Sequence, residues 1–214
     1  MICNNMLLST PLVSKVNMTQ CLTHDLKEDM SEIAHFIDLL NDLKKKQHIK
    51  KRLDFFYDFE HEGWEKWLQM ELLYAMNENW GADHYKEIQY DIDKRKSERS
   101  FSQLDLVYRR PKTTSDVFVG VELKVINEPN RCIKGSLADL QKFSKLKPSQ
   151  WDFRAIIAMA VYLPEQRENS KALALAREHE TLQFGPYEVA IISWETEPKN
   201  EFKFPGFRDW LAQQ

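Results

Sequence analysis

The fold is decided by residues 101–125, which read FSQLDLVYRRPKTTSDVFVGVELKV. Two runs rich in β-branched, aromatic and aliphatic residues flank a central segment, residues 110–116, that is rich in Pro, Thr, Ser and Asp. Turn residues between two such runs are typical of a β-hairpin. The sequence therefore predicts two strands, Phe101–Arg109 and Val117–Val125, joined by a turn.

Side chains alternate between the two faces of a strand, so each predicted strand has an apolar and a polar face. The apolar faces are expected to carry Leu104, Leu106, Tyr108, Val119, Val121, Leu123 and Val125. The opposite faces carry Asp105 on the first strand and Glu122 and Lys124 on the second. The hairpin thus predicts one face on which two carboxyl groups and an amine gather.

The pairing register brings the two carboxyl groups together. If the strands pair symmetrically about a point between Thr113 and Thr114, Asp105 lies opposite Glu122, with Cβ atoms ~4.5–5.5 Å apart. Two carboxylates this close repel unless a cation lies between them or one binds a proton. A divalent metal with oxygen ligands is the usual solution, so this face is a candidate metal site. Taken singly, each of these residues also fits an ordinary polar position on a strand.

Composition and charge restrict the class of protein only broadly. The chain has 214 residues, 43% hydrophobic and 29% charged, which suits one globular domain. Its net charge of −3 does not indicate a nucleic-acid binder, although binding to phosphates depends on the charge close to them rather than on the net charge. Cys3, Cys21 and Cys132 are scattered, which favours a reducing cytoplasm over a disulfide framework or structural zinc. We expect no signal peptide and no membrane-spanning segment.

The first part of the chain divides into an irregular segment, residues 1–22, and one helix over roughly residues 23–56. The helix carries a Lys-rich run, Lys44 to Lys46, followed by Lys50, Lys51 and Arg52. This run is either the solvated face of a helix that covers the core or an arm that contacts phosphates. Residues 23–214 are expected to form a single domain.

A second helix is expected over residues 63–77, because Trp64, Trp67, Leu68, Leu72 and Ala75 recur at helical spacing. Glu71 lies in the middle of this apolar stripe, where a carboxylate needs a partner or a cation. Glu65 and Gln69 lie at the edge of the stripe and are expected to be more solvated. Glu65 is the rival to Glu71 as the acidic residue that this helix contributes to a site.

The remaining elements follow from similar patterns. Residues 85–92 alternate as a strand, and residues 136–146 are expected to form a helix after a loop. Residues 153–163 are nearly all apolar and predict a central strand that is covered on both faces. A helix over residues 164–180, a strand over residues 186–194 and a polar tail complete the expected order.

Residues 62–163 resemble the PD-(D/E)xK nuclease superfamily in element order and in motif residues. The resemblance rests on Glu71 in WLQMEL, on Asp105 in SQLDLV and on Glu122 and Lys124 in VGVELKV. It implies a restriction endonuclease-like α/β core, with a mixed central β-sheet flanked by helices and preceded here by an extra N-terminal helical segment. Leu104 stands where the name-giving motif has Pro, a position that does no chemistry.

The resemblance implies a Mg²⁺-dependent phosphodiester hydrolase, in which Mn²⁺ substitutes for Mg²⁺. Asp105, Glu122 and the carbonyl of Leu123 would hold the metal, and Glu71 would complete its shell or hold a second ion. These are the oxygen ligands that hard cations prefer. Lys124 would orient or activate the attacking water, and we expect the metal beside it to lower its pKa.

Basic residues near the ends of the hairpin and after it are candidates for contacts with nucleic acid, with DNA as the expected substrate. They are Arg95, Lys96, Arg99, Arg109, Arg110, Lys112, Arg131, Lys134 and Lys142. The sequence contains no separate recognition module, so specificity would come from loops, homodimerisation or a partner, or be absent. A catalytically inactive binding or assembly protein on the same fold is the alternative, and a toxin or immunity partner that recognises protein is a third.

Overall fold

The structure is a computed structural model that describes residues 31–81, 84–91, 101–109, 117–143, 152–164, 180–196 and 202–203. The chain divides into two units, residues 1–31 and residues 32–214, and the fold below is that of the second unit. The irregular segment expected over residues 1–22 and most of the helix expected over residues 164–180 lie outside the described residues.

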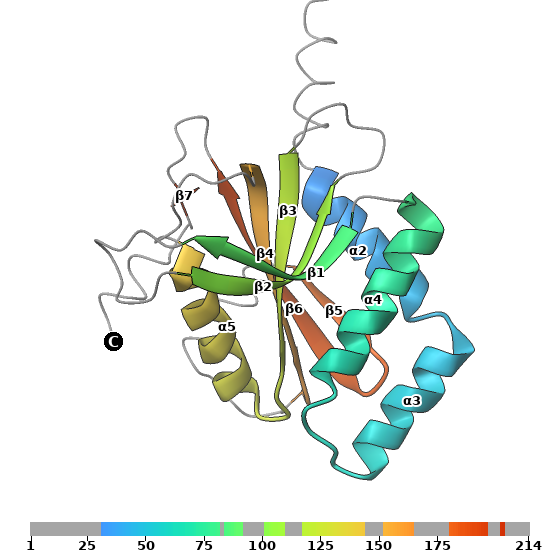
Figure 1. The fold of residues 1–214 in the computed structure, drawn as a ribbon. Helices are drawn as coiled ribbons and strands as arrows, with labels where there is room; N and C mark the ends of the chain where they lie inside the picture. The colour runs from blue at the N-terminus through green and yellow to red at the C-terminus, as the bar shows by residue number, and fades with distance from the viewer. Residues whose placement is uncertain are drawn as a thin grey trace, which may run out of the picture. The chain divides into compact units, whose positions relative to one another are not determined.

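Four described helices and seven strands build this unit (Figure 1). The helices are α2 (Ser31–Leu43), α3 (Gln47–Asp58), α4 (Glu65–Trp80) and α5 (Pro129–Phe143). The strands are β1 (His84–Asp91), β2 (Phe101–Arg109), β3 (Val117–Val125), β4 (Asp152–Tyr162), β5 (Glu180–Phe184), β6 (Tyr187–Thr196) and β7 (Phe202–Lys203). Six strands lie in the order β1-β2-β3-β4-β6-β5, and β7 pairs with β6. Only β3 and β4 pair in parallel among the described strands, so the fold is a mixed α/β fold.

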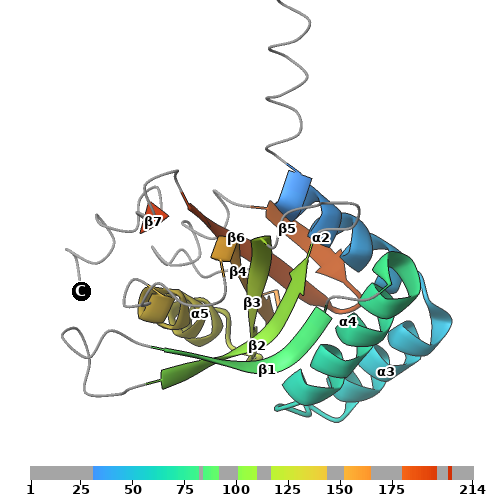
Figure 2. The same ribbon diagram turned by 45° about the horizontal axis from the view of Figure 1, so that its top comes forward.

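Helices cover both faces of the sheet and define two cores (Figure 2). Helices α2, α3 and α4 pack on one face, where Ile157, Met159 and Val161 of β4 point. Helix α5 packs on the other face, where Ile156 and Ala158 of the same strand point. A strand buried on both faces lacks an alternating pattern, because each of its side chains enters one core or the other. This is why residues 153–163 are nearly all apolar.

The central prediction of the hairpin is confirmed. Strands β2 and β3 have the expected bounds, and they pair antiparallel with Leu106 opposite Val121 and Tyr108 opposite Val119. This is the register of a turn centred between residues 113 and 114. β4 is central, as expected, between β3 and β6.

Two expectations about the elements are wrong, and one strand was not expected. The single N-terminal helix is two helices, α2 and α3, separated by residues 44–46 of the Lys-rich run. Helix α5 begins at Pro129 rather than at Ser136, because the Glu128 carboxylate accepts hydrogen bonds from the N–H groups of Asn130 and Arg131 and a proline suits the first helical position. Strand β5 was not expected from its mostly exposed, polar sequence; it pairs with β6 across a tight turn at Gly185, where φ is 64°.

No helix among the described residues is both long enough and apolar enough to cross a membrane.

Candidate functional site

The site lies where β2 separates from β3. The two strands pair from Arg109 opposite Phe118 only as far as Leu106 opposite Val121. Beyond this point β2 continues with β1, and the β1–β2 ribbon crosses the direction of β3 (Figure 1). Asp105 and Glu122 are the next residues in the same register, directly at the point of separation. We call this point the fork.

Beyond the fork, β3 has an edge that no longer pairs with β2, and two carboxylates accept hydrogen bonds from N–H groups on this edge. The Leu123 N–H donates to Oδ2 of Asp105 at 2.8 Å, and the Val125 N–H donates to the carboxylate of Glu65. The N–H and C=O of one strand residue point to the same side, so the Leu123 carbonyl also faces the fork. The edge of β3 thus presents a carbonyl oxygen between two acidic residues.

Glu122 has the most strongly perturbed carboxyl group of the cluster. Burial, together with the charges of Asp105 and Asp139, raises the pKa of Glu122 to about 9, and the protonated carboxyl is hydrogen-bonded to Asp105. The expected repulsion between the two carboxyl groups is therefore present in the structure. Without a cation, a proton on Glu122 relieves it.

Lys124 is bound to α5. Its Nζ lies 2.8 Å from Oδ2 of Asp139, which Lys142 also contacts through its other oxygen, and its aliphatic chain passes Gly135. Burial alone would lower the pKa of Lys124, but Asp139, with smaller contributions from Glu65 and Glu122, outweighs burial and raises it. The expectation of a lowered pKa assumes a metal beside Lys124 and stays a prediction; without a metal the pKa of Lys124 is raised.

The acidic residue that α4 contributes to the fork is Glu65, and the placement of Glu71 there is wrong. Burial and the nearby Asp105 raise the pKa of Glu65, against the lowering effects of Lys124 and the Val125 N–H. Glu71 instead lies beside His48 of α3, with Oε2 3.3 Å from Nε2. Glu65 is in the first turn of α4, and its carboxylate reaches the backbone of Val125 in β3. The apolar stripe did not show which side and which end of α4 approach the strand.

Gln69 is a member of the site that the sequence pattern placed at a solvated edge. Its side chain is buried, at 2% exposure, and Nε2 donates to the backbone carbonyl of Asp105 at 2.6 Å. The only signal in the sequence is its spacing, since residues four apart on a helix share one side, and Gln69 follows Glu65 by four.

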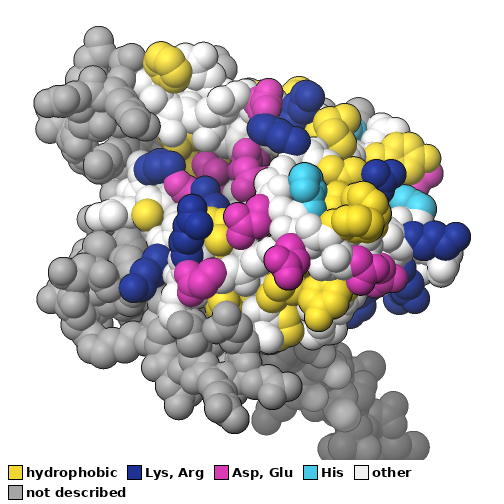
Figure 3. Space-filling view, turned by 90° about the horizontal axis from the view of Figure 1, so that it is seen from below, with side chains coloured by type: hydrophobic (Ala, Val, Ile, Leu, Met, Phe, Trp, Pro, Cys, Tyr) yellow, Lys and Arg dark blue, Asp and Glu magenta, His cyan; other side chains and the backbone are white. Residues whose placement is uncertain are grey.

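The basic residues expected to contact nucleic acid are only partly described. Arg131 and Lys134 are exposed on α5, Arg109 is half-buried at the end of β2, and Lys142 is paired with Asp139. Outside the described residues lie Arg95, Lys96, Arg99, Arg110 and Lys112. In the view of Figure 3, the coloured acidic and basic side chains lie next to one another, without a continuous basic patch among the described residues.

The oxygen atoms at the fork are of the kind that a hard divalent cation binds, but they are not arranged around a ready-made metal site. Among the described residues, no three Asp, Glu, His or Cys side chains are grouped closely enough to hold a metal ion. Two carboxyl groups do meet, however, and one of them holds a proton that a cation would replace. Asp105, Glu122 and the Leu123 carbonyl are therefore the residues that could hold such an ion, with Glu65 beside them.

The chain matches no family model, no curated protein and no solved structure.

Proposed function

We propose that the protein is a metal-dependent nuclease that hydrolyses phosphodiester bonds in DNA through an Asp/Glu-x-Lys site. The observation that carries the proposal is the contact between Asp105 and Glu122 at the fork, with Lys124 two residues further along β3. Placing two half-buried carboxyl groups together costs stability, and their arrangement beside the half-buried Lys124 suits the charge compensation that phosphodiester cleavage needs.

The order of elements supports the same proposal. Helix α4, strands β1, β2 and β3, helix α5 and strand β4 follow one another as the resemblance to PD-(D/E)xK nucleases implies. The parallel pairing of β3 with β4 and the position of α5 between them in the chain fit a restriction endonuclease-like core. Helices α2 and α3 are the additional N-terminal segment.

Each residue of the fork has a role in this chemistry. Asp105, Glu122 and the Leu123 carbonyl would bind Mg²⁺ or Mn²⁺, and Glu65 would take the role first assigned to Glu71. When bound, the ion polarises the phosphate and lowers the pKa of a water molecule at the site. Without a metal, Asp139 raises the pKa of Lys124, so Lys124 would act at the site as an ammonium group that stabilises developing negative charge.

The substrate is inferred from the surface of α5. Arg131 and Lys134 are exposed on the helix whose Asp139 holds Lys124, so they can neutralise backbone phosphates of a bound nucleic acid. Such contacts bind the backbone without reading sequence. Affinity for DNA should therefore fall steeply as the salt concentration rises.

A cleavage assay tests the proposal. The parent is expected to cut linear or circular DNA with Mg²⁺ or Mn²⁺, and EDTA should stop the reaction. Asp105→Asn, Glu122→Gln and Lys124→Met should each lower the rate by about a hundredfold or more, since the first two remove an ionisable metal ligand and the third removes the ammonium group. Glu71→Gln is the matched control and should cut as fast as the parent. If the three site variants also cut as fast as the parent, the assignment of the site is wrong.

Two observations favour a second candidate, a catalytically inactive protein that binds nucleic acid or assembles with a partner on this fold. Lys124 is engaged by Asp139, and the described acidic residues do not form a ready-made metal site. Calorimetric titration with Mn²⁺ distinguishes the two candidates. If the protein is inactive, the titration should show no Mn²⁺ binding that is lost in Glu122→Gln. The parent should then also fail to cut linear, circular or single-stranded DNA and RNA.

A further inference from the structure

The ladder between β1 and β2 is interrupted beside the fork. Lys86 pairs with Leu106 and Ile88 pairs with Leu104, but the residues between them, Glu87 and Asp105, do not pair. Glu87 has a φ of 52°, in the left-handed region that residues with a side chain seldom adopt. The chain thus departs from regular strand geometry at the position opposite Asp105.

The interruption turns β2 about its own axis. Leu104 and Leu106 are two residues apart, so in a regular strand both would point to the same face. Instead Leu104 packs in the core beneath α5, whereas Leu106 packs in the core beneath α2 to α4. The expectation that the two leucines share a face is wrong for this reason. Asp105 lies between them, at the point of the turn.

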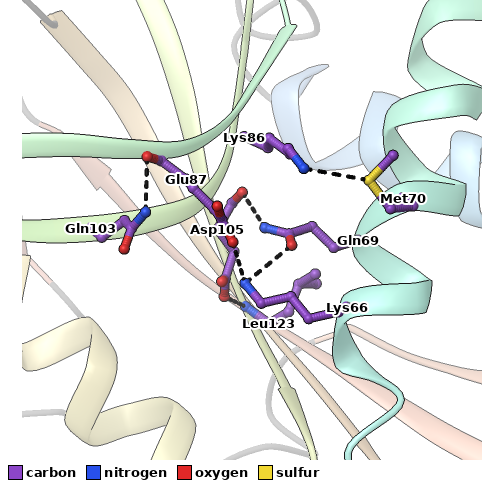
Figure 4. A network of polar contacts seen from close by, with 8 residues as sticks. All are labelled: Lys66, Gln69, Met70, Lys86, Glu87, Gln103, Asp105 and Leu123. Carbon is purple, nitrogen blue, oxygen red and sulfur yellow. Dashed lines mark hydrogen bonds and ion pairs between the residues drawn. The ribbon is translucent and has the colours of Figure 1, made fainter.

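Two glutamine side chains bind the carbonyl groups that the interruption releases (Figure 4). Gln69 of α4 donates from Nε2 to the Asp105 carbonyl at 2.6 Å, and Gln103 of β2 donates from Nε2 to the Glu87 carbonyl at 3.0 Å. The Asp105 carbonyl is part-buried and needs such a partner, whereas the Glu87 carbonyl is exposed. Each glutamine supplies a hydrogen bond at a position where the ladder between β1 and β2 is interrupted.

The amide group of Gln69 is itself fixed in orientation. Lys66 lies 3.3 Å from Oε1 of Gln69 and forms an ion pair with Glu87 at 2.6 Å. An ammonium group can only donate, so it contacts the oxygen of the amide and leaves the NH₂ group directed at Asp105. Helix α4, through Lys66 and Gln69, thus contacts both residues of the interruption.

We propose that Gln69 is a positioning residue that fixes the Asp105 carboxylate at the fork. By binding the Asp105 carbonyl, Gln69 holds this part of the backbone toward α4, and the carboxylate then reaches the Leu123 N–H at 2.8 Å. That this placement prepares Asp105 to bind a divalent ion rests on the proposed function. That Gln69 holds the Asp105 carboxylate at the Leu123 N–H is independent of it.

Gln69→Met tests both parts, because methionine keeps the length of the side chain and lacks the donor. Removing a residue that orients a metal ligand typically weakens metal binding 10–100-fold, so calorimetry should show a loss of Mn²⁺ affinity of about tenfold or more. By NMR, amide hydrogen exchange at Leu123 should become faster relative to exchange at Val121. Val121 is the internal reference, because it lies in the same strand, β3, and pairs with Leu106 of β2. Gln89→Met, at an exposed glutamine of β1, is the matched control and should change neither quantity.

The outcomes separate this inference from the proposed function. If Gln69→Met keeps the parent's Mn²⁺ affinity and its ratio of exchange rates, Gln69 only fills space and the inference is wrong. If the parent binds no Mn²⁺, the metal role of Asp105 is wrong, and the exchange ratio still decides whether Gln69 positions its carboxylate. Gln103→Met, at an exposed residue, serves if Gln69→Met does not fold, and it should shift the exchange ratio in the same direction.

Discussion

Replacing Glu122 by glutamine should change how the stability of the protein depends on pH. In the folded protein, burial and the charges of Asp105 and Asp139 raise the pKa of Glu122 to about 9, whereas its value in the unfolded chain is near 4.5. Between these two values the folded protein holds one proton more than the unfolded chain. Raising the pH through this interval therefore lowers the free energy of unfolding.

The size of this effect follows from proton linkage. One proton of difference changes the free energy of unfolding by about 1.4 kcal/mol per pH unit. From pH 6 to pH 8, Glu122 should therefore cost the parent about 3 kcal/mol. Glutamine cannot ionise, and its NH₂ group can donate to Asp105 as the protonated carboxyl does. The free energy of unfolding of the variant should therefore not fall through this group. The other titrating groups are the same in both proteins, so they affect both pH profiles equally.

Urea unfolding in EDTA at pH 6, 7 and 8 measures this difference. The free energy of unfolding of the parent should fall by about 3 kcal/mol more than that of Glu122→Gln over this range. Adding Mg²⁺ should reduce the loss in the parent but not affect the variant, because a bound ion stabilises only the folded state that holds it. Parallel pH profiles for parent and variant in EDTA would show that Glu122 does not hold a proton in the folded protein.

Three further changes test other parts of the structure. Glu65→Gln should weaken Mn²⁺ binding by about tenfold in calorimetry, whereas Glu71→Gln should leave it unchanged; equal effects would contradict the assignment of Glu65 as the acidic residue from α4. Leu68→Ala should lower the free energy of unfolding in urea by about 2–5 kcal/mol, since Leu68 is fully buried, and a loss as small as that of a surface substitution would argue against its place in the core. Gly81→Ala should cost about 1–3 kcal/mol in the same assay, because the C-cap of α4 has a φ of 78° and a ψ of −144° with open space around it; an unchanged midpoint would refute the strained backbone.

The hairpin could be predicted from the sequence because two independent signals agree on it. The alternation of side chains set the bounds of β2 and β3, and the Pro- and Thr-rich turn set their register. A shift by one residue would have moved Val121 and Leu123 out of the core, so few alternatives compete. The proximity of Asp105 and Glu122 follows from the register alone, and for this reason the centre of the candidate site could also be predicted.

The surroundings of the hairpin could not be predicted in the same way. The turn of β2 at Asp105 requires a positive φ at Glu87, a residue that gives no signal of the kind that glycine gives. It also requires Gln69, which comes from another element 36 residues earlier in the chain. Periodicity describes one element at a time, whereas this turn depends on contacts between α4, β1 and β2.

The choice between Glu65 and Glu71 shows a related limit. The apolar stripe of α4 is a property of angle around the helix axis, and by angle Glu71 is the better candidate. The two residues differ by about 120° around the axis and by about 9 Å along it, at about 100° and 1.5 Å per residue. Glu65 shares a side of α4 with Gln69, which contacts Asp105, whereas Glu71 lies beside His48 of α3. The side that faces the fork is set by how α4 packs against the sheet and against α3, which the stripe alone does not show.

The carboxyl groups around the fork differ in what compensates their charge, and this difference indicates where a cation would enter. Asp105 accepts the Leu123 N–H, Glu65 accepts the Val125 N–H, and Asp139 contacts the ammonium groups of Lys124 and Lys142. Glu122 instead keeps a proton up to a pH of about 9. A divalent ion that displaced this proton would find the Asp105 carboxylate and the Leu123 carbonyl on the same edge of β3. Its binding should therefore release a proton at neutral pH, and it should grow tighter as the pH rises toward 9.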